Sequence, residues 1–430
     1  MSAAMHLNLF VLGVGHHEAA WRLPDAPAGG TTDVAFYAGL CRRAEAAALD
    51  SVFFADRLAL PPSARYNAVE SLEPLTLLAA LAAQTEQIGL IGTVSTTFSE
   101  PYTVARQLAT LDHISGGRVG WNIVTSIDPA AARNYGRDFP DHAARYARAA
   151  EFTDVALKLW DGWKPGARID DRERGIYVDD ARVRPAAHAG THFEVAGALN
   201  VPRSPQGRPL LVQAGSSEDG RALASRYADA VFTAQQTLDG AVAFREDIRA
   251  RAGAHGRDPD RVVVLPGICP VIGATEAEAR ERAEELDGLI VTEYALHQLR
   301  EFLGVDLSGH PLDAPLPPLP AADGIETHKS RFALIVELAQ REQLTLRQLI
   351  ARMGGGRGHR VIAGAPEQIA DELEAWFRAG AADGFNVMPP ALPRDGVAFL
   401  DRVVPELQRR GLFRSEYGET SLRARYGVGD

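Results

Sequence analysis

The stretch IGLIGTVSTTFSEPYTVARQLATLDHISGGRVGWNIVT, residues 88–125, predicts one strand–helix–strand unit. Its two ends, residues 88–94 and 119–125, are short apolar runs typical of buried strands, whereas residues 102–114 carry apolar side chains at three- and four-residue spacing. Two parallel strands joined by a crossover helix are the repeating unit of α/β proteins. The stretch therefore predicts an α/β fold with a parallel sheet.

The same alternation recurs along the rest of the chain. Helical periodicity is found at residues 73–85, 145–160, 239–251 and 366–379. Eight strand–helix pairs favour a closed (β/α)8 TIM barrel, here as one domain over residues 1–430, although a doubly wound open sheet with an appended domain is the alternative. The eight candidate strands are residues 7–12, 51–54, 88–94, 119–125, 210–214, 230–233, 262–272 and 385–388.

Two segments interrupt the alternation. Residues 164–209 mix Arg, Asp, Pro and Gly with one strand-like piece at residues 192–195, which predicts a long excursion before the fifth strand. Residues 275–358 contain a charged helix at residues 276–303, a Pro-rich tract at residues 311–320 and two further helical stretches. Because structureless loops of this length are uncommon in compact domains, we expect a helical insertion that either covers the active site or forms a subunit contact.

Composition narrows the class of protein. A formal net charge of -11 argues against nucleic-acid binding, because phosphate backbones attract concentrated Lys and Arg. The two cysteines, Cys41 and Cys269, form no CxxC pair and no disulfide framework, a pattern that suits the reducing cytoplasm. The N-terminal apolar run at residues 7–14 is too short to cross a membrane and lacks the preceding basic residues of a signal peptide.

The sequence lacks the motifs that several cofactor-dependent enzyme classes require. A GxGxxG nucleotide-binding turn is approached only at residues 13–15 and 354–358, and both stretches lack the third glycine at the required position. The sequence also contains no GxxxxGK[ST] phosphate-binding loop. A Schiff-base barrel enzyme needs a lysine at a strand end, but the lysines are Lys158, Lys164 and Lys329, outside the predicted strands. These observations disfavour a built-in nicotinamide domain and almost exclude Schiff-base chemistry.

Polar residues follow the second, third and fourth predicted strands, where barrel enzymes place functional groups. Asp56 ends the apolar run 52–55, and its structural alternative is an N-cap or a salt bridge to Arg57. Thr93 and Asn122, with neighbouring hydroxyl residues, can hydrogen-bond the edge of a heteroaromatic ring without adding charge. The preference of Thr for strands explains part of this pattern equally well.

Residues 213–220, QAGSSEDG, pass from a strand into a helix with Ser216 and Ser217 at the predicted helix start. Free backbone N–H groups and the positive end of the helix dipole suit a phosphate there. Simple N-capping by serine is the alternative, and local chemistry alone favours it.

His16, His17 and Glu18 follow the first strand and include good metal-ligand types. Adjacent side chains usually point apart, and no HExxH helix accompanies them. We therefore expect no metal, and interpret these residues as a polar strand end.

These motifs together resemble the bacterial-luciferase-like flavin monooxygenases, and within them the nitrilotriacetate monooxygenase and dibenzothiophene-sulfone monooxygenase group. The resemblance covers nearly the whole chain, so it is far more specific than any single motif. The resembling stretches are GHHEAAWR (15–22), VFFADRL (52–58), EPLTLLAALAAQTEQIGL (73–90), TLDHISGGRVGWNIVTS (110–126), RYARAAEF (145–152), QAGSSEDGR (213–221) and GFNVMPP (384–390). Ala150 departs from the family pattern, which usually has an acidic residue there.

The resemblance implies a (β/α)8 barrel that binds FMN at its mouth, with the phosphate at a helix N-terminus. It assigns no catalytic acid or base. The implied cofactor contacts are Asp56, Thr93, His142, Tyr146, Ser216 and Ser217. The residues expected on the substrate side are His16, His17, Trp21 and Asn122.

The implied reaction uses FMNH2 from a separate NAD(P)H-dependent flavin reductase. Oxygen adds to form a C4a-hydroperoxyflavin, and one oxygen atom passes to a small organic substrate that is sulfur- or nitrogen-containing or aminopolycarboxylate-like. The resemblance also implies a cytoplasmic homodimer or homotetramer. Two alternatives remain: a deazaflavin (F420)-dependent oxidoreductase of the same superfamily, and a flavin-binding protein without turnover.

Overall fold

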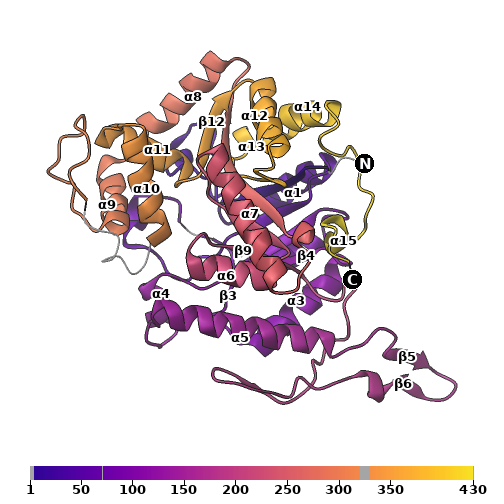
Figure 1. The fold of residues 1–430 in the computed structure, drawn as a ribbon. Helices are drawn as coiled ribbons and strands as arrows, with labels where there is room; N and C mark the ends of the chain where they lie inside the picture. Colours follow the sequence, from indigo (N-terminus) through magenta and orange to yellow (C-terminus); the bar gives the residue numbers. More distant parts are fainter. Residues whose placement is uncertain (1–3, 70, 320–328, 430) are drawn as a thin grey trace.

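The computed structural model describes residues 4–69, 71–319 and 329–429, and its centre is a closed ring of eight parallel strands (Figure 1). β10 pairs with β11, β11 with β13, and β13 with β1, so the ring has no free edge. This confirms the predicted (β/α)8 barrel and excludes the open sheet. The ring strands, in order around the barrel, are β1 (His6–Val11), β2 (Ser51–Phe54), β3 (Gly89–Ser95), β4 (Val119–Val124), β9 (Leu210–Ala214), β10 (Ala230–Thr233), β11 (Val263–Ile272) and β13 (Gly384–Val387).

Helices surround the ring and bury its outward-facing side chains. In β1, for example, Leu7, Leu9 and Val11 belong to the large apolar cluster shared with the outer helices, whereas Phe10 belongs to a second cluster inside the ring. This alternation follows from the two-residue period of a strand. The outer helices are α1 (Val34–Ala46), α2 (Pro74–Ala82), α3 (Pro101–Ser115), α5 (His142–Asp161), α6 (Glu218–Tyr227), α7 (Leu238–Ala254), α12 (Pro366–Arg378), α13 (Arg394–Ala398) and α14 (Val404–Arg409).

The C-terminal segment closes the amino-terminal end of the barrel. Leu422 and Tyr426, in and just after α15 (Leu422–Arg425), are buried in the cluster inside the ring. The Tyr426 hydroxyl donates a 2.7 Å hydrogen bond to Oδ1 of Asn8 in β1, which also accepts a bond from the Ser51 hydroxyl at 2.9 Å. These three polar side chains are therefore paired within the protein, and the described cavity opens at the opposite rim.

The segment between β11 and β13 forms helices and one additional strand. The predicted single helix at residues 276–303 was wrong in detail, because α8 (Glu276–Gly288) and α9 (Thr292–Leu303) are separate helices. α10 (Lys329–Arg341) and α11 (Leu346–Gly356) follow, and Pro320 of the Pro-rich tract lies outside the described residues. β12 (Arg360–Gly364), which periodicity did not predict, pairs with the distal half of β11 outside the ring.

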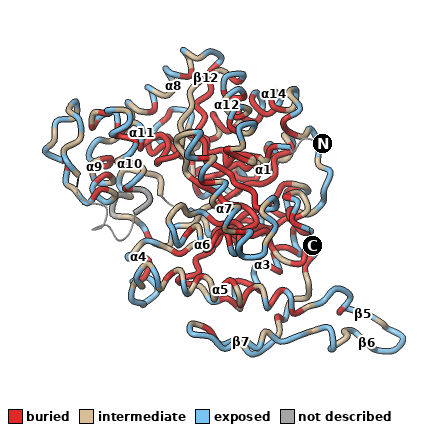
Figure 2. The backbone as a smooth tube through the Cα atoms, in the orientation of Figure 1, coloured by how far each residue is buried: buried red, intermediate tan, exposed pale blue. Residues whose placement is uncertain are grey.

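The segment between α5 and β9 extends away from the barrel (Figure 1) and is largely exposed (Figure 2). It contains two small antiparallel hairpins where one strand-like piece was predicted. Their strands are β5 (Arg168–Asp171), β6 (Ile176–Val178), β7 (His188–Ala189) and β8 (Glu194–Val195), and α4 (Pro129–Asn134) is a short helix before α5. Within the described residues, no helix combines the length and the apolarity that crossing a bilayer requires.

A buried carboxylate ties the chain ends to the amino-terminal side of the barrel. Asp50 is fully buried; its oxygens accept the backbone N–H of Leu7 at 2.7 Å and contact Arg414 Nη1 at 2.9 Å and His6 Nδ1 at 3.2 Å. Burial favours the neutral acid, but Arg414 and His6 outweigh it and hold the pKa of Asp50 below its usual range. The charged form therefore stabilises the fold.

We predict that Asp50→Asn lowers the free energy of unfolding at pH 7 by about 3 kcal/mol, because it removes the buried charge that pairs with the partly buried Arg414. Since the folded pKa is depressed, the contribution of Asp50 is present above the ordinary carboxyl pKa and is lost as pH falls through the folded value. Urea unfolding at pH 7 and pH 3 should show a smaller loss for the variant than for the wild type. Equal acid sensitivity in both proteins would contradict this role.

Candidate active site

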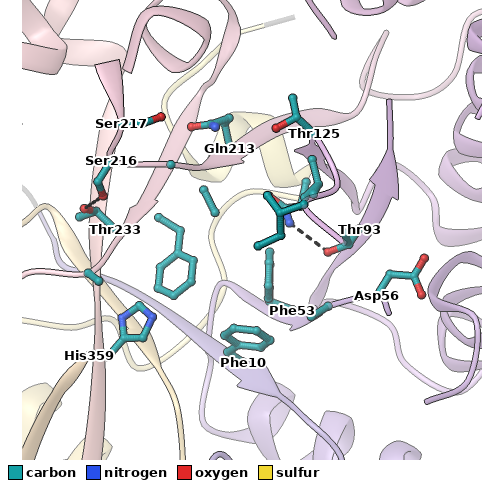
Figure 3. Close-up of a pocket in the computed structure, with 18 of the residues that line it drawn as sticks. Phe10, Phe53, Asp56, Thr93, Thr125, Gln213, Ser216, Ser217, Thr233 and His359 are labelled. Carbon is teal, nitrogen blue, oxygen red and sulfur yellow. Dashed lines mark hydrogen bonds between the residues drawn. The ribbon is translucent and has the colours of Figure 1, made fainter. Parts of the chain in front are cut away.

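A cavity of about 570 Å³ opens at the carboxyl ends of the barrel strands (Figure 3). Its floor is aromatic: the ring centroid of Phe10 lies 4.5 Å from that of Phe53 and 5.8 Å from that of Phe232. The His359 ring stacks on Phe232 at 5.0 Å with an interplanar angle of 5°. Leu334 of α10 also lines the cavity, so the segment between β11 and β13 contributes to its wall. Phe10 meets the other two phenylalanine rings edge to face, so the floor is an apolar aromatic surface against which a ring system can pack.

Thr93 and Asn122 lie side by side on β3 and β4 at the cavity wall. The Thr93 hydroxyl donates to the carbonyl oxygen of Phe54 at 2.9 Å and accepts from Nδ2 of Asn122 at 2.9 Å. Oδ1 of Asn122 is buried with no hydrogen-bond partner in the described part of the chain, and Oε1 of Gln213 in β9 is in the same state. Because an unpaired buried acceptor costs free energy, these two oxygens suit the N–H donors of a bound ligand.

Ser216 and Ser217 occupy the junction of β9 and α6 on the cavity wall. Ser217 is the N-cap of α6, and its hydroxyl accepts the backbone N–H of Gly220 at 3.1 Å, so the N-capping alternative holds for this residue. The Ser216 hydroxyl lies 3.1 Å from that of Thr233 in β10. A helix N-terminus with two hydroxyls at a cavity wall is suited to an anion such as phosphate.

Two acidic residues, Glu218 and Asp219, occupy the first turn of the same helix and oppose a bound anion. Glu218 is paired with arginines and Asp219 contacts a histidine. The carboxylate of Glu218 forms salt bridges with Arg251 and Arg221. That of Asp219 lies 2.9 Å from Nε2 of His142. The charge of Glu218 at the mouth of the anion site is therefore partly neutralised.

His142 and Tyr146 open α5, whose N-cap Asp141 accepts the N–H of Ala144 at 2.7 Å. Their ring centroids lie 4.8 Å apart, as the four-residue spacing on one helical face predicts. Both line the cavity. The structure thus brings these two residues together with the serines of α6.

Asp56 lies at the end of the cavity opposite Ser216 and Ser217 (Figure 3). Its Oδ1 accepts the backbone N–H of Arg57 at 2.8 Å, which is a local turn contact and not an ion pair with the guanidinium. Burial raises the pKa of Asp56 above its ordinary value. The cavity therefore unites all six residues expected to contact the cofactor, together with Asn122.

The structure does not place His16, His17 or Trp21 in the wall of this cavity. His16 lies behind the floor, with Nε2 3.0 Å from the Phe10 carbonyl oxygen and its ring edge-on to Phe10. Burial, then the charge of Arg357, lowers the pKa of His16 to about 3, so its ring is neutral near pH 7. Trp21 is 43% exposed and donates its indole N–H to the Tyr66 carbonyl at 3.1 Å.

His17 faces a second cavity of about 650 Å³ between α8 and α11, where its Nε2 lies 3.2 Å from Oδ1 of Asp287. The backbone around it is fixed by its neighbours. A Cβ on Gly15 would collide with the Pro390 carbonyl oxygen, which accepts the N–H of His17 at 3.0 Å. Within the described ranges, no three His, Cys, Asp or Glu side chains are grouped to hold a metal ion.

Sequence reasoning did not single out several cavity residues. Gln213 lies near the end of β9 just as Asn122 lies near the end of β4, so its strand-end position could have identified it. Phe10 and Phe232 were indistinguishable from ordinary core residues of their strands. Leu334 and His359 come from the segment at residues 275–358 or directly follow it, where no pattern in the chain indicates which side chains meet the barrel mouth.

Comparison with known proteins decides the family. The family model described as luciferase-like monooxygenase matches residues 15–383. The chain belongs to the luciferase-like monooxygenases. The expected membership of this family is confirmed, and the protein is an oxidoreductase.

Three relatives illustrate how closely this luciferase-like monooxygenase matches known members. It is 45% identical to the N-acetyl-S-(2-succino)cysteine monooxygenase of Bacillus subtilis (strain 168), over 98% of this chain and 96% of the relative. It is 46% identical to nitrilotriacetate monooxygenase component A of Aminobacter aminovorans, over 100% and 98%. The solved EDTA monooxygenase from Chelativorans sp. BNC1 superposes with a TM-score of 0.81 at 36% identity, over 99% and 98%. The match therefore extends over the full length of this monooxygenase.

The geometry at the start of α6 separates the two serines. We predict that Ser217→Ala lowers the free energy of unfolding by about 0.5–2 kcal/mol, because it removes the N-cap of a 10-residue helix. Ser216→Ala should lower it by less, because the Ser216 hydroxyl contacts only the Thr233 hydroxyl, at 3.1 Å, and caps no backbone group. Urea unfolding of both variants measures the difference. Equal losses would show that Ser217 is not the residue that caps the helix.

Proposed function

We propose that this protein is an FMN-dependent monooxygenase that uses FMNH2 from a separate NAD(P)H:flavin reductase, together with O2, to add one oxygen atom to a small organic substrate. One observation carries the proposal. A single cavity combines an anion-suited helix N-terminus, an aromatic floor and two buried amide oxygens without partners. These features match, in that order, the phosphate, the flat ring system and the ring N–H groups of FMN.

The residues present fit FMN on this basis. Ser216 and the N-terminus of α6 would hold the phosphate, and Tyr146 and His142 would flank it from α5. Oδ1 of Asn122 and Oε1 of Gln213 would accept ring N–H groups, with Thr93 fixing the orientation of the Asn122 amide. Asp56 would contact the opposite end. The reduced flavin, when bound, supplies the electrons that activate oxygen.

The protein's own contribution is to position the ligands and to exclude water and stray protons. Phe10, Phe53 and Phe232 offer no exchangeable proton to the cavity floor. His16 behind the floor is held neutral, so it carries no extra proton near pH 7. Leu334 adds an apolar contact from α10. A dry, shaped site of this kind is what an oxygen-activating cofactor requires.

The names of the relatives support the remaining parts of the proposal. One is component A of its monooxygenase, which is consistent with a second protein that supplies reduced flavin. The names N-acetyl-S-(2-succino)cysteine and nitrilotriacetate denote substrates that carry carboxylates and a sulfur or nitrogen atom. We also expect the protein to be cytoplasmic and to form a homodimer or homotetramer. Size-exclusion chromatography with light scattering measures the oligomeric state.

The unpaired amide oxygens give a test of the cofactor site. We predict that Asn122→Leu and Gln213→Leu each raise the Kd for FMN about tenfold or more, because each removes a hydrogen bond of roughly 1.4 kcal/mol or more in a buried site. Quenching of flavin fluorescence on titration measures the Kd.

Gln107→Leu is the matched control, because Gln107 lies exposed on the outer helix α3. Its FMN affinity should equal that of the wild type. Wild-type affinity in both Asn122→Leu and Gln213→Leu would remove these residues from the site.

Activity is tested with the purified protein, FMN, NADH and a generic flavin reductase under air, scanning candidate substrates for the gain of one oxygen atom by mass spectrometry. The proposal expects substrate-dependent oxygen incorporation. Hydride transfer with deazaflavin and no oxygen uptake would instead indicate the F420-dependent alternative. Tight FMN binding without turnover of any substrate would indicate a flavin-binding protein.

A further inference from the structure

The Ser216 hydroxyl at the anion site belongs to a short chain of hydrogen bonds. It lies 3.1 Å from the Thr233 hydroxyl (Figure 3). The Thr233 hydroxyl in turn accepts a hydrogen bond from Nε2 of Gln235 at 2.9 Å. Ser216 and Thr233 line the cavity, whereas Gln235 stands outside its wall. Gln235 therefore reaches a ligand in this cavity only through the two hydroxyls.

The chemistry of the three groups fixes the direction of this hydrogen-bond chain. The NH2 of an amide only donates, so the Thr233 oxygen accepts from Gln235, and the single Thr233 proton remains for another acceptor. Because Thr233 is only 2% exposed, an unpaired hydroxyl proton there would cost free energy. Its other side-chain partner in the described structure is the Ser216 oxygen. Thr233 therefore donates to Ser216, and the Ser216 proton is left for the cavity.

The first turn of α7 holds the Gln235 amide in this orientation. Oε1 of Gln235 lies on the side of Gly240, 3.6 Å from the position that a Cβ on this glycine would take. Backbone N–H groups and the positive end of the helix dipole are concentrated at a helix N-terminus, so an amide oxygen is favoured there over an amide NH2. The NH2 of Gln235 is consequently directed to Thr233.

The loop that carries Gln235 is held in place by the residues that follow it. Nε2 of Gln236 donates to the Gly358 carbonyl oxygen at 2.9 Å, and Nη1 of Arg360 donates to the Gln236 carbonyl oxygen at 3.3 Å. Thr237 is the N-cap of α7. The Gln235 side chain takes part in none of these bonds. Its replacement should therefore leave the backbone of the loop unchanged.

We propose that Gln235 is a positioning residue that fixes the direction of the Thr233–Ser216 hydrogen bond, so that Ser216 donates to the phosphate of the bound flavin; this rests on the proposed function. A phosphate oxygen accepts hydrogen bonds, and a hydroxyl whose proton is already used elsewhere offers it none. Without the amide donor, Ser216 is free to donate to Thr233 instead, and its proton is lost to the ligand. Gln235 thus favours a phosphorylated over an unphosphorylated flavin without contacting it.

The test compares FMN with riboflavin, which has the same ring system and lacks the phosphate. The Kd of each flavin is measured by fluorescence quenching for the wild type, Gln235→Leu and Gln235→Glu. Leucine removes the amide donor, and glutamate replaces the amide by an acceptor of the same size. Gln107→Leu is the matched control, because Gln107 lies exposed on α3.

We expect Gln235→Leu to raise the Kd for FMN about threefold or more, because the hydrogen bond from Ser216 to the phosphate is partly lost. Gln235→Glu should raise it about tenfold or more, because the carboxylate accepts the Thr233 proton and reverses the chain. The Kd for riboflavin should stay at the wild-type value in both variants. Neither Kd should change in Gln107→Leu.

The same substitutions in a Ser216→Ala background separate positioning from other effects. Without the Ser216 hydroxyl there is no proton to direct, so each Gln235 substitution should then change the Kd for FMN less than about twofold. Repulsion between the new carboxylate of Gln235→Glu and the phosphate would persist in this background. Riboflavin binding checks that the double variants retain an intact site.

The proposal is overturned if the Kd for FMN is unchanged in either Gln235 variant, if riboflavin is weakened as much as FMN, or if the effects persist in Ser216→Ala. Equal affinity of the wild type for FMN and riboflavin also overturns it, and this comparison does not depend on the folding of any variant. That result leaves the proposed function standing. Failure of the wild type to bind either flavin instead contradicts the proposed function, and the role of Gln235 with it.

Discussion

The closure of eight parallel strands into a ring is the constraint on which the site depends. Once β10 pairs with β11 and β13 with β1, every ring strand is hydrogen-bonded on both sides. All eight carboxyl ends must then meet at one rim. Residues far apart in the chain, such as Thr93, Gln213 and Phe232, are brought together by this closure and not by any local contact.

The two ends of the barrel differ in how their polar groups are satisfied. At the amino-terminal end, Asp50, Asn8 and Tyr426 are bonded to partners within the protein, and the C-terminal segment fills the opening. At the carboxyl end, Asn122 and Gln213 keep buried acceptors without partners in the described structure. Burying such groups costs free energy unless a ligand donates hydrogen bonds to them. Stability is therefore concentrated at one end and ligand binding at the other, which is the usual division in this fold.

Most strands of the barrel could be predicted from the sequence, because they contain short apolar runs or a two-residue alternation of apolar side chains. The fold prediction failed where a local pattern does not determine the tertiary partner. β12 is half-buried and short, and it is identifiable only through its pairing with β11. Likewise, residues 276–303 have one charged, helical composition, yet the chain turns between Gly288 and Thr292. This turn lets α9 pack with α10 and α11 in an apolar cluster of their own.

The same distinction applies to the candidate site. Residues at strand ends or helix starts, such as Asp56 and Ser216, could be nominated because their position in a barrel is known once the strand is known. Leu334 could not, since its place on the cavity wall depends on how α10 packs over the barrel mouth. His359 likewise could not be nominated, because only the structure shows that its ring stacks on Phe232 at the cavity.

The most direct measurement is a crystal structure of the protein loaded with FMN. The account requires the phosphate at Ser216 and the start of α6, and the ring over Phe10 and Phe53 with its N–H groups against Asn122 and Gln213. Density for the flavin elsewhere, or a cavity filled by the protein's own side chains under saturating FMN, would contradict it.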